Sequence, residues 1–161
     1  MLLSLTKGEE RMRIIKYGSQ DTDFYEQTLH LRNKVLRQPL GKSIFEEDLT
    51  IEKENDFYGW EKERQIIATL SIYTKENKVA QLTAFAVEPT YQNKGYGNRL
   101  LEFLLDDLGK KGYERVDVSA RSSAKTFYEK SGFMVLGNPV VNVALGTEDY
   151  LMTRVINFSV K

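Results

Sequence analysis

One stretch of this sequence, residues 82–108, constrains the fold more than any other, because it predicts a strand, a turn and a helix in direct succession. Its beginning, Leu82–Val87, is short, apolar and compatible with β structure, and Pro89 ends it. Apolar side chains then recur at helical spacing, at Tyr96, Leu100, Leu101, Leu104, Leu105 and Leu108. The stretch therefore predicts a strand that runs into an amphipathic helix.

The turn between these two elements, Gln92–Gly97, carries glycines at the point where the helix begins. Gly95 and Gly97 allow backbone N–H groups to face a ligand without obstruction by side chains. The first N–H groups of a helix have no internal partner and carry partial positive charge, which suits an anion. We therefore interpret this turn as a phosphate-binding site.

Length and composition predict one globular domain. The chain has 161 residues, of which 41% are hydrophobic and 29% charged, ordinary values for a protein with a full core. Lys+Arg and Asp+Glu both number 23, so no net field recruits nucleic acid or an anionic membrane. Cysteine is absent, which excludes disulfides, thiolate metal sites and a cysteine nucleophile. We expect residues 1–10 to be a flexible lead-in and residues 11–161 to form the domain.

The apolar start of the chain does not indicate a membrane or secreted protein. Met1–Leu5 is too short for a secretory signal and lacks a basic segment before it. No run approaches the roughly 20 apolar residues that a spanning helix needs. The expectation is a cytoplasmic protein without a membrane partner.

The remaining elements predict an α+β fold with a mixed sheet. Strands are expected over residues 11–17, 56–61, 64–73, 78–87, 115–119, 133–136 and 150–156. Helices are expected after the cap candidates Asp21 and Ser122 or Ser123, and over Tyr96–Leu108, with Gly109 and Gly112 at its exit. Short connections imply antiparallel strands first, and a strand–helix–strand crossover follows. We predict α/β/α layers.

Two sequence blocks, taken together, resemble the GNAT superfamily of acyl-CoA-dependent N-acyltransferases. Residues 92–97 match its Q/R-x-x-G-x-G/A signature, and Ala120–Phe133 resembles its second block, a short helix ending FYEKxGF. Leu31–Gly41 is similar to a subset of that superfamily with an LRxxVxRxPLG start. With the element order, the resemblance spans roughly residues 11–156.

The resemblance implies an N-acetyltransferase that uses acetyl-CoA as acyl donor, with no metal. The strand Thr83–Val87 would splay from its neighbour, with a bulge, and pair with the pantetheine arm. Asn98 stands where relatives often carry Ser or Thr, and Arg121 replaces a common Asn. The cofactor contacts implied are Phe85, Ala86, Val87, Gln92, Asn93, Lys94, Gly95, Tyr96, Gly97, Asn98, Arg121, Ala124 and Phe127. Further cations considered for the phosphates are Arg99 and Lys125.

Tyr128 matches the tyrosine that protonates the departing CoA thiolate in many relatives, because a positioned phenol can donate as the sulfur gains charge. The general base stays open. The candidates are Glu46, Glu47, Asp48, Tyr73, Thr83, Glu88 and Tyr150. The acceptor would be a small-molecule or peptide amine, and dimerisation is common in the superfamily.

Two alternatives remain beside this reading. A domain of the same fold could bind acyl-CoA as a sensor or partner module without turning it over. A dinucleotide-binding enzyme is disfavoured, because Leu100 stands where the third glycine of G-x-G-x-x-G belongs. One histidine and no cysteine leave no recognisable metal-ligand set, and no basic stripe supports nucleic-acid binding.

Overall fold

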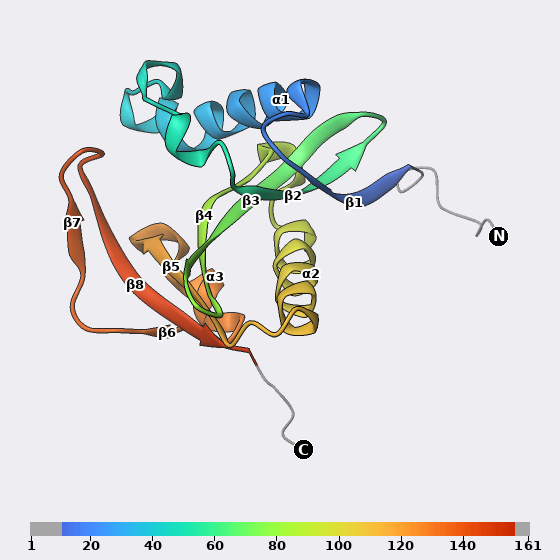
Figure 1. Cartoon of the computed structure of the whole chain (residues 1–161). Helices are drawn as coiled ribbons and strands as arrows, with labels where there is room; N and C mark the ends of the chain where they lie inside the picture. The colour runs from blue at the N-terminus through green and yellow to red at the C-terminus, as the bar shows by residue number, and fades with distance from the viewer. Residues whose placement is uncertain (1–10, 157–161) are drawn as a thin grey trace.

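The computed structural model describes residues 11–156, which fold around one eight-stranded sheet (Figure 1). The strand order is β1-β2-β3-β4-β5-β8-β6, and β7 pairs with β8. The strands are β1 (Met12–Tyr17), β2 (Asp56–Lys62), β3 (Gln65–Glu76), β4 (Val79–Val87), β5 (Arg115–Arg121), β6 (Met134–Val135), β7 (Val140–Asn142) and β8 (Thr147–Val155). The helices are α1 (Thr22–Arg32), α2 (Tyr96–Lys110) and α3 (Lys125–Lys130). The predicted α+β fold with a mixed sheet is confirmed.

Within residues 11–156, β4 and β5 form the one parallel pair of the sheet, and we call this junction the seam. These strands pair in parallel over four residues each, Val79–Leu82 with Arg115–Val118, whereas the other pairs within residues 11–156 are antiparallel. Beyond the seam, β4 continues to Val87 and β5 to Arg121 without pairing to each other. The C-terminal parts of both strands therefore leave backbone groups free.

A bulge in β4 lies where this pairing ends. Thr69 of β3 is opposite Ala86 and Ser71 is opposite Thr83, so β4 has one residue more than β3 in this interval. Ala84 absorbs it with a φ of 57°, a left-handed conformation that non-glycine residues rarely adopt. The predicted bulge within Thr83–Val87 is confirmed.

The core forms on both faces of the first four strands. The predicted stripe of α2 packs against one face, where Leu100, Leu101, Leu104 and Leu108 are fully buried with Leu82, and α3 adds Tyr128 to this cluster. Leu31 of α1 packs with Phe57 and Ala86 on the opposite face. Helices thus lie on both sides of the sheet (Figure 1). No helix within residues 11–156 has the length and apolar character to cross a membrane.

Several local predictions were wrong. Strand β7 was missed, because three residues are too few to display an alternating pattern. Gly109 lies inside α2, which ends at Lys110, so only Gly112, with φ 86°, forms the exit. The predicted serine cap of α3 is absent, because Ser122 Oγ donates to the Glu148 carbonyl instead, 3.0 Å away.

The segment around α1 also differs from the prediction. Asp21 precedes α1, but its carboxylate accepts from Gly18 N, 2.9 Å away, instead of from the helix. Helix α1 passes into a π-helix, Asn33–Arg37, and then into 3₁₀ turns at Gln38–Leu40, Ile44–Glu46 and Thr50–Glu52. The lead-in predicted for residues 1–10 lies outside the described residues, and the boundaries of the single domain stay a prediction.

Candidate active site

The glycine-bearing turn that opens α2 presents unsatisfied N–H groups. Gly95 is the N-cap residue with φ 90°, and Asn93 has φ 61°, so the chain reverses twice before the helix begins. The Gly95 carbonyl accepts the first helical hydrogen bond, from Arg99 N at 3.0 Å. No side chain caps this end of the helix, so the first N–H groups of α2 lack an internal partner. The arrangement suits a phosphate oxygen, and the phosphate-binding role of the turn stays a prediction.

A cleft of about 480 Å³ begins at this turn and follows the free part of β4. Gly97 is the point of closest approach, since a Cβ there would be 3.4 Å from Val87 Cγ2 and 3.8 Å from the Phe127 ring. Strand β4, α2 and α3 therefore converge on one glycine. The lining residues are Val35, Phe85, Ala86, Val87, Tyr91, Gln92, Asn93, Gly95, Gly97, Asn98, Ser123, Ala124, Phe127 and Tyr128.

The edge of β4 inside the cleft offers backbone groups to a ligand. Glu88 N donates to the Ile67 carbonyl on β3, 2.8 Å away. Because alternate residues of a strand point the same way, the amides of Phe85 and Val87 face away from β3, toward the gap before β5. The Val87 carbonyl on this side already accepts from Gln92 Nε2 at 2.9 Å. An extended ligand can therefore add to β4 as another strand would.

Tyr128 reaches the cleft from α3 through an aromatic cluster. Its ring is 5.2 Å from those of Phe127 and Phe133 and 6.3 Å from that of Phe85, centroid to centroid. The side chain is 4% exposed, and burial raises the pKa of the phenol well above its usual value. The hydroxyl has no hydrogen-bond partner within residues 11–156, and it remains protonated at neutral pH.

Strand β4, the turn that opens α2 and the block on α3 all lie within the match of one family model. The model of the acetyltransferase (GNAT) family matches residues 21–133. The chain belongs to the GNAT family. The match covers more than half of the sequence, including both blocks on which the resemblance rested.

Relatives and solved structures agree with this assignment. Serotonin N-acetyltransferase from Mesocricetus auratus is 32% identical over 85 residues, 52% of this chain and 41% of that protein. The ribosomal protein bS18-alanine N-acetyltransferase from Escherichia coli is 42% identical over 57 residues, 34% of this chain and 38% of that protein. The matched stretches thus span less than half the length of these relatives.

The fold is shared over nearly the whole chain. The crystal structure of the E. coli ribosomal-protein-S18-alanine N-acetyltransferase superimposes with a TM-score of 0.70 at 19% identity, covering 93% of this chain and 97% of that one. N-acetylglutamate synthase from Neisseria gonorrhoeae, complexed with coenzyme A and N-acetyl-glutamate, gives 0.68 at 18% identity, covering 91% and 35%. At these identities the likeness shows the fold alone.

Most of the cofactor contacts predicted for this GNAT chain come together in the cleft, but Lys94, Tyr96 and Arg121 do not line it. Tyr96 packs edge-on against Trp60, and its carbonyl accepts from Trp60 Nε1 at 2.9 Å. Lys94 Nζ lies 6.0 Å from the centre of the Tyr91 ring. Arg121 points to the opposite side of the sheet, toward the π-helix. The cofactor roles of these residues stay predictions.

The two other cations considered for the phosphates are engaged elsewhere. The Arg99 guanidinium stacks over the Trp60 and Tyr96 rings, at 5.2 and 4.9 Å. Lys125 Nζ pairs with Glu129 at 2.9 Å and lies over the Tyr150 ring. Both would have to leave these partners to reach a phosphate.

Three lining residues escaped prediction. Val35 comes from the π-helix, far upstream of the glycine turn, and its only signal was the LRxxVxRxPLG motif. Tyr91 lies in the 3₁₀ turn Pro89–Tyr91 just before the glycine turn, and Ser123 was considered only as a helix cap.

None of the seven general-base candidates lines the cleft. Glu47 pairs with Arg37 at 2.6 Å and Glu88 pairs with Lys34 at 2.8 Å. The exposed Asp48 accepts from Thr50, and these hydrogen bonds lower its pKa. The base therefore stays open, and transfer through water is compatible with this geometry.

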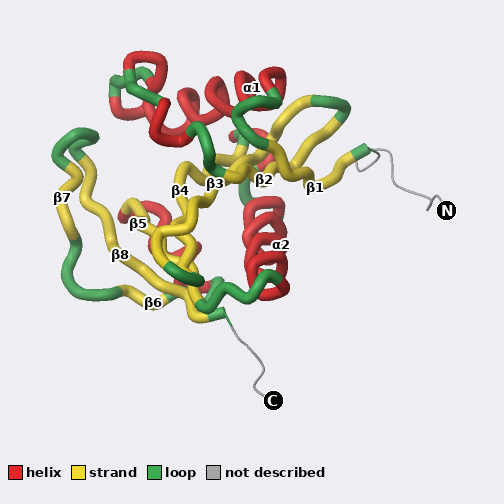
Figure 2. Tube along the Cα trace, viewed as in Figure 1, coloured by secondary structure: helices red, strands yellow, loops and turns green. Residues whose placement is uncertain are grey.

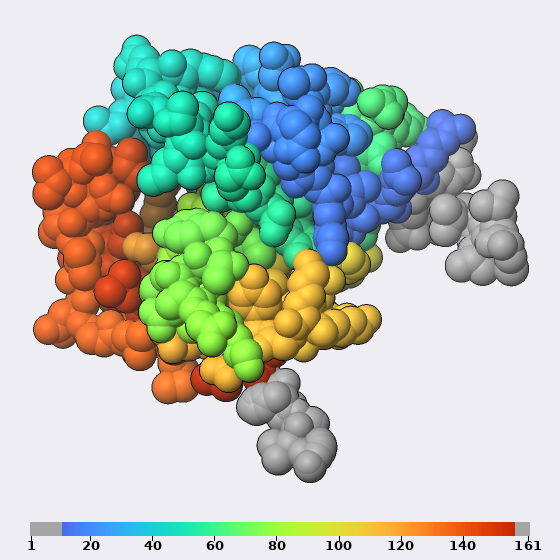
Figure 3. All heavy atoms as spheres, viewed as in Figure 1, coloured from blue at the N-terminus to red at the C-terminus, as the bar shows by residue number. Residues whose placement is uncertain are grey.

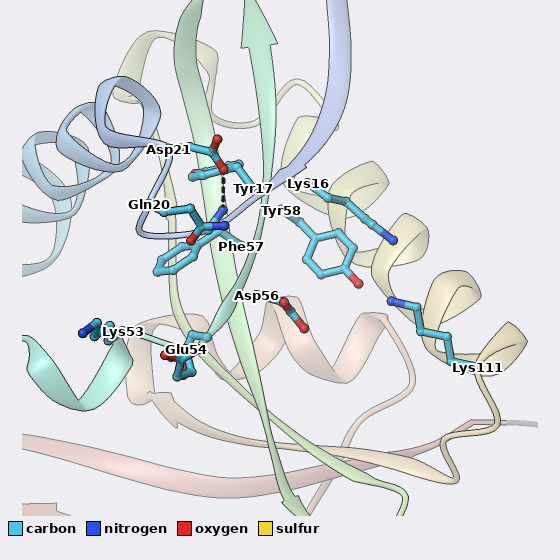
Figure 4. A pocket seen from close by; sticks show the side chains of 12 residues that line it. Lys16, Tyr17, Gln20, Asp21, Lys53, Glu54, Asp56, Phe57, Tyr58 and Lys111 are labelled. Atoms are coloured by element: carbon cyan, nitrogen blue, oxygen red, sulfur yellow. Dashed lines mark hydrogen bonds between the residues drawn. The ribbon is translucent and has the colours of Figure 1, made fainter.

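A second cavity, of about 370 Å³, shares no lining residue with the cleft. Lys16 of β1 and Lys111 after α2 point toward one another across the Tyr58 hydroxyl (Figure 4). Both ammonium groups pair with the same carboxylate, that of Asp107, at 3.1 and 3.2 Å. Within residues 11–156 no group of His, Asp and Glu side chains could hold a metal ion.

Proposed function

We propose that this protein transfers an acetyl group from acetyl-CoA to a primary amine within a ternary complex. The observation that carries the proposal is the seam: β4 stops pairing with β5 at Leu82 and continues as a free edge to the N–H groups that open α2. Family membership supports acyl transfer as the reaction class. Acetyl-CoA as donor and direct attack as mechanism belong to the proposal.

The turn and the strand would hold two adjoining parts of the cofactor. The N–H groups of residues 93–98 would bind the pyrophosphate. No side chain caps this helix terminus, so these groups are open to a ligand. The amides of Phe85 and Val87 would pair with the pantetheine arm along the free edge of β4. One of these N–H groups would face the thioester oxygen as negative charge develops, and such donors are typically worth about a hundred- to a thousandfold in rate.

Tyr128 would complete the transfer as a general acid. The amine nitrogen forms a bond to the acetyl carbon, the carbon–sulfur bond breaks, and the sulfur leaves with the electron pair. The Tyr128 hydroxyl donates its proton to that sulfur, and the amine proton passes to water or a base. Burial raises the pKa of Tyr128, so the phenol carries its proton at neutral pH and is a donor when the thiolate forms.

A module that binds acyl-CoA without turnover is the alternative. It is favoured by one observation, that none of the base candidates lines the cleft. Retention of a tyrosine hydroxyl in the cleft without another hydrogen-bond partner, within residues 11–156, favours the enzyme instead.

Calorimetry with coenzyme A, followed by release of free thiol from acetyl-CoA in the presence of an amine panel, tests the proposal. We expect Tyr128→Phe to bind coenzyme A normally and to lower turnover about a hundredfold, because general acids contribute about 10²–10⁴-fold. Tyr113→Phe is the matched control, since Tyr113 contacts Thr74 at 2.7 Å, outside the cleft, and should leave the rate unchanged.

Three results separate the readings. No affinity for coenzyme A in folded protein would overturn the whole proposal. Binding without thiol release across the panel would favour the non-catalytic module. Full turnover in Tyr128→Phe would leave the transferase intact and remove the acid assignment.

A further inference from the structure

Strand β5 lies across the seam from β4, and none of its residues lines the cleft. Along β5, Val116, Val118 and Ala120 pack into the core beneath α2 and α3. Because strand side chains alternate between faces, Ser119 and Arg121 point to the other face, the one that α1 covers on the first four strands. A molecule approaching the seam from this side would meet them opposite the proposed cofactor.

Arg121 crosses the seam on this face. Its Nη2 donates to the Leu36 carbonyl in the π-helix, 2.8 Å away, joining β5 to the segment that follows α1. Arg37 Nη1 donates to the same carbonyl at 3.3 Å. Two guanidinium groups therefore converge on one neutral oxygen, next to Val35 in the wall of the cleft.

Within residues 11–156, Arg37 has a counterion and Arg121 has none. Arg37 forms a two-pronged pair with Glu47, with nitrogen–oxygen distances of 2.6 and 3.2 Å. Arg121 has no carboxylate within ion-pair distance in the part of the chain that the structure describes. Asp149, its neighbour on β8, is buried and accepts from Thr147 at 3.1 Å and Ser119 at 3.5 Å.

The environment of Arg121 disfavours an isolated charge. Burial, and then the nearby Arg37 guanidinium, lower the pKa of Arg121, and Asp149 offsets only part of this. A half-buried cation held beside a like charge is stabilised when an anion arrives, and a planar guanidinium suits a carboxylate above all. Arg121 therefore presents a half-buried guanidinium to which an anion could bind.

We propose that Arg121 binds a carboxylate on the acceptor, so that the acceptor is an amino acid or another amine carrying a nearby carboxylate. This inference rests on the proposed function, and it assigns Arg121 to the acceptor instead of to the cofactor. The turn that would hold the pyrophosphate precedes α2 and lines the cleft together with the start of α3, whereas the guanidinium lies on the face of α1. The surface is hollowed between the β7–β8 hairpin and the β3–β4 turn (Figure 3), which leaves an approach from outside.

The test uses reaction products as probes, in matched pairs. N-acetylated glycine, alanine, leucine, glutamate and phenylalanine, each with its C-terminal amide, are titrated by calorimetry into the full-length protein, with and without coenzyme A. We expect at least one acid to bind about tenfold or more tightly than its amide, the range for a hydrogen bond to a charged group. Arg121→Gln should abolish that preference, and Arg121→Lys should restore part of it.

Controls separate this inference from the proposed function. Lys110→Gln removes an exposed cation from the far end of α2 and should keep the preference for the acid. Arg121→Gln should keep its melting temperature and its affinity for coenzyme A. The inference is overturned if no acid binds more tightly than its amide or if Arg121→Gln keeps the preference for the acid. It is also overturned if Arg121→Gln no longer binds coenzyme A. Failure of the wild type to bind coenzyme A would instead contradict the proposed function.

Discussion

The two halves of the sheet differ in how much of their surface is buried. Strands β1–β4 are covered on both faces, by α1 and by α2, and residues such as Phe57 and Leu70 have no exposed surface. Strands β5 and β8 pack against α2 and α3 on one face, through residues such as Val118 and Met152. The trace of β7 and β8 lies away from α2 (Figure 2). On the open face of this half Leu151 remains 45% exposed and Met134 65%.

The difference shows where binding can be accommodated without unfolding. The covered half supplies rigidity, and the open half leaves one wall accessible. The two meet at four parallel residue pairs, beyond which neither strand satisfies the other's backbone. A ligand that supplies the missing hydrogen bonds therefore binds at the boundary between the halves and disrupts neither core.

The largest expected effect tests the contrast in burial directly. Leu104 is fully buried on the inner face of α2, so Leu104→Ala should lower the free energy of unfolding by about 3 kcal/mol, through lost burial and a cavity. Leu151→Ala, on the open face of β8, should change it by less than about 0.5 kcal/mol. Urea denaturation of both variants measures the difference.

Equal losses in the two variants would break the comparison. They would mean that the open face of β8 is covered in solution, for example by a second copy of the chain. Repeating the denaturation of Leu151→Ala over a range of protein concentrations would reveal such an association, because the stability of a dimer depends on concentration.

Local patterns explain which parts of the molecule were predictable. The stripe at Leu100, Leu104 and Leu108 is a short-range signal, and all three residues are buried as predicted. The glycine turn was also recognisable, because Gly95 adopts the left-handed conformation for which glycine is suited. Both features depend on residues close in sequence.

Features set by distant pairing were not predictable. The strand expected to end at Ser119 continues to Arg121, because Asp149 on β8 pairs opposite it. That extension places Arg121 on the face of α1, outside the lining of the cleft. The contribution of Val35 to the cleft likewise requires the π-helix to fold back over β4.

Two glycines, one at each end of α2, allow the effect of the turn on binding to be separated from its effect on stability. Gly95 and Gly112 have φ of 90° and 86°, and a Cβ at either would meet nothing within 4 Å. Substitution by alanine should therefore lower the free energy of unfolding by about 1 kcal/mol at each site. Only Gly95→Ala should also lower the affinity for coenzyme A, by about tenfold, because the strained turn would rotate its N–H groups away from the pyrophosphate.

Thermal melts and coenzyme A calorimetry on both variants measure these two effects separately. An equal loss of affinity in Gly112→Ala would show that general destabilisation, and not the turn, controls binding. Unchanged affinity in Gly95→Ala would remove the turn from the proposed phosphate site.

The smallest expected effect concerns how charge joins the elements of the covered half. Burial raises the pKa of Asp107 on α2, but hydrogen bonds from Tyr58, Lys16 and Lys111 outweigh it and lower that pKa to about 2. The unfolded value is about 3.9, so this stabilisation is complete above about pH 4 and is lost as the pH falls toward 2.

Asp107→Asn should consequently lower the free energy of unfolding by about 1 kcal/mol at pH 7, and the difference from the wild type should shrink as the pH falls from about 4 to 2. Asp106→Asn is the matched control, because Asp106 is 69% exposed and its pair with Lys110 lies on the surface. Its effect should be smaller than that of Asp107→Asn at pH 7. If the Asp107→Asn difference stayed constant down to pH 2, the links from α2 to β1 and β2 would stabilise the protein by packing alone. The rigidity of the covered half would then owe nothing to this carboxylate's charge.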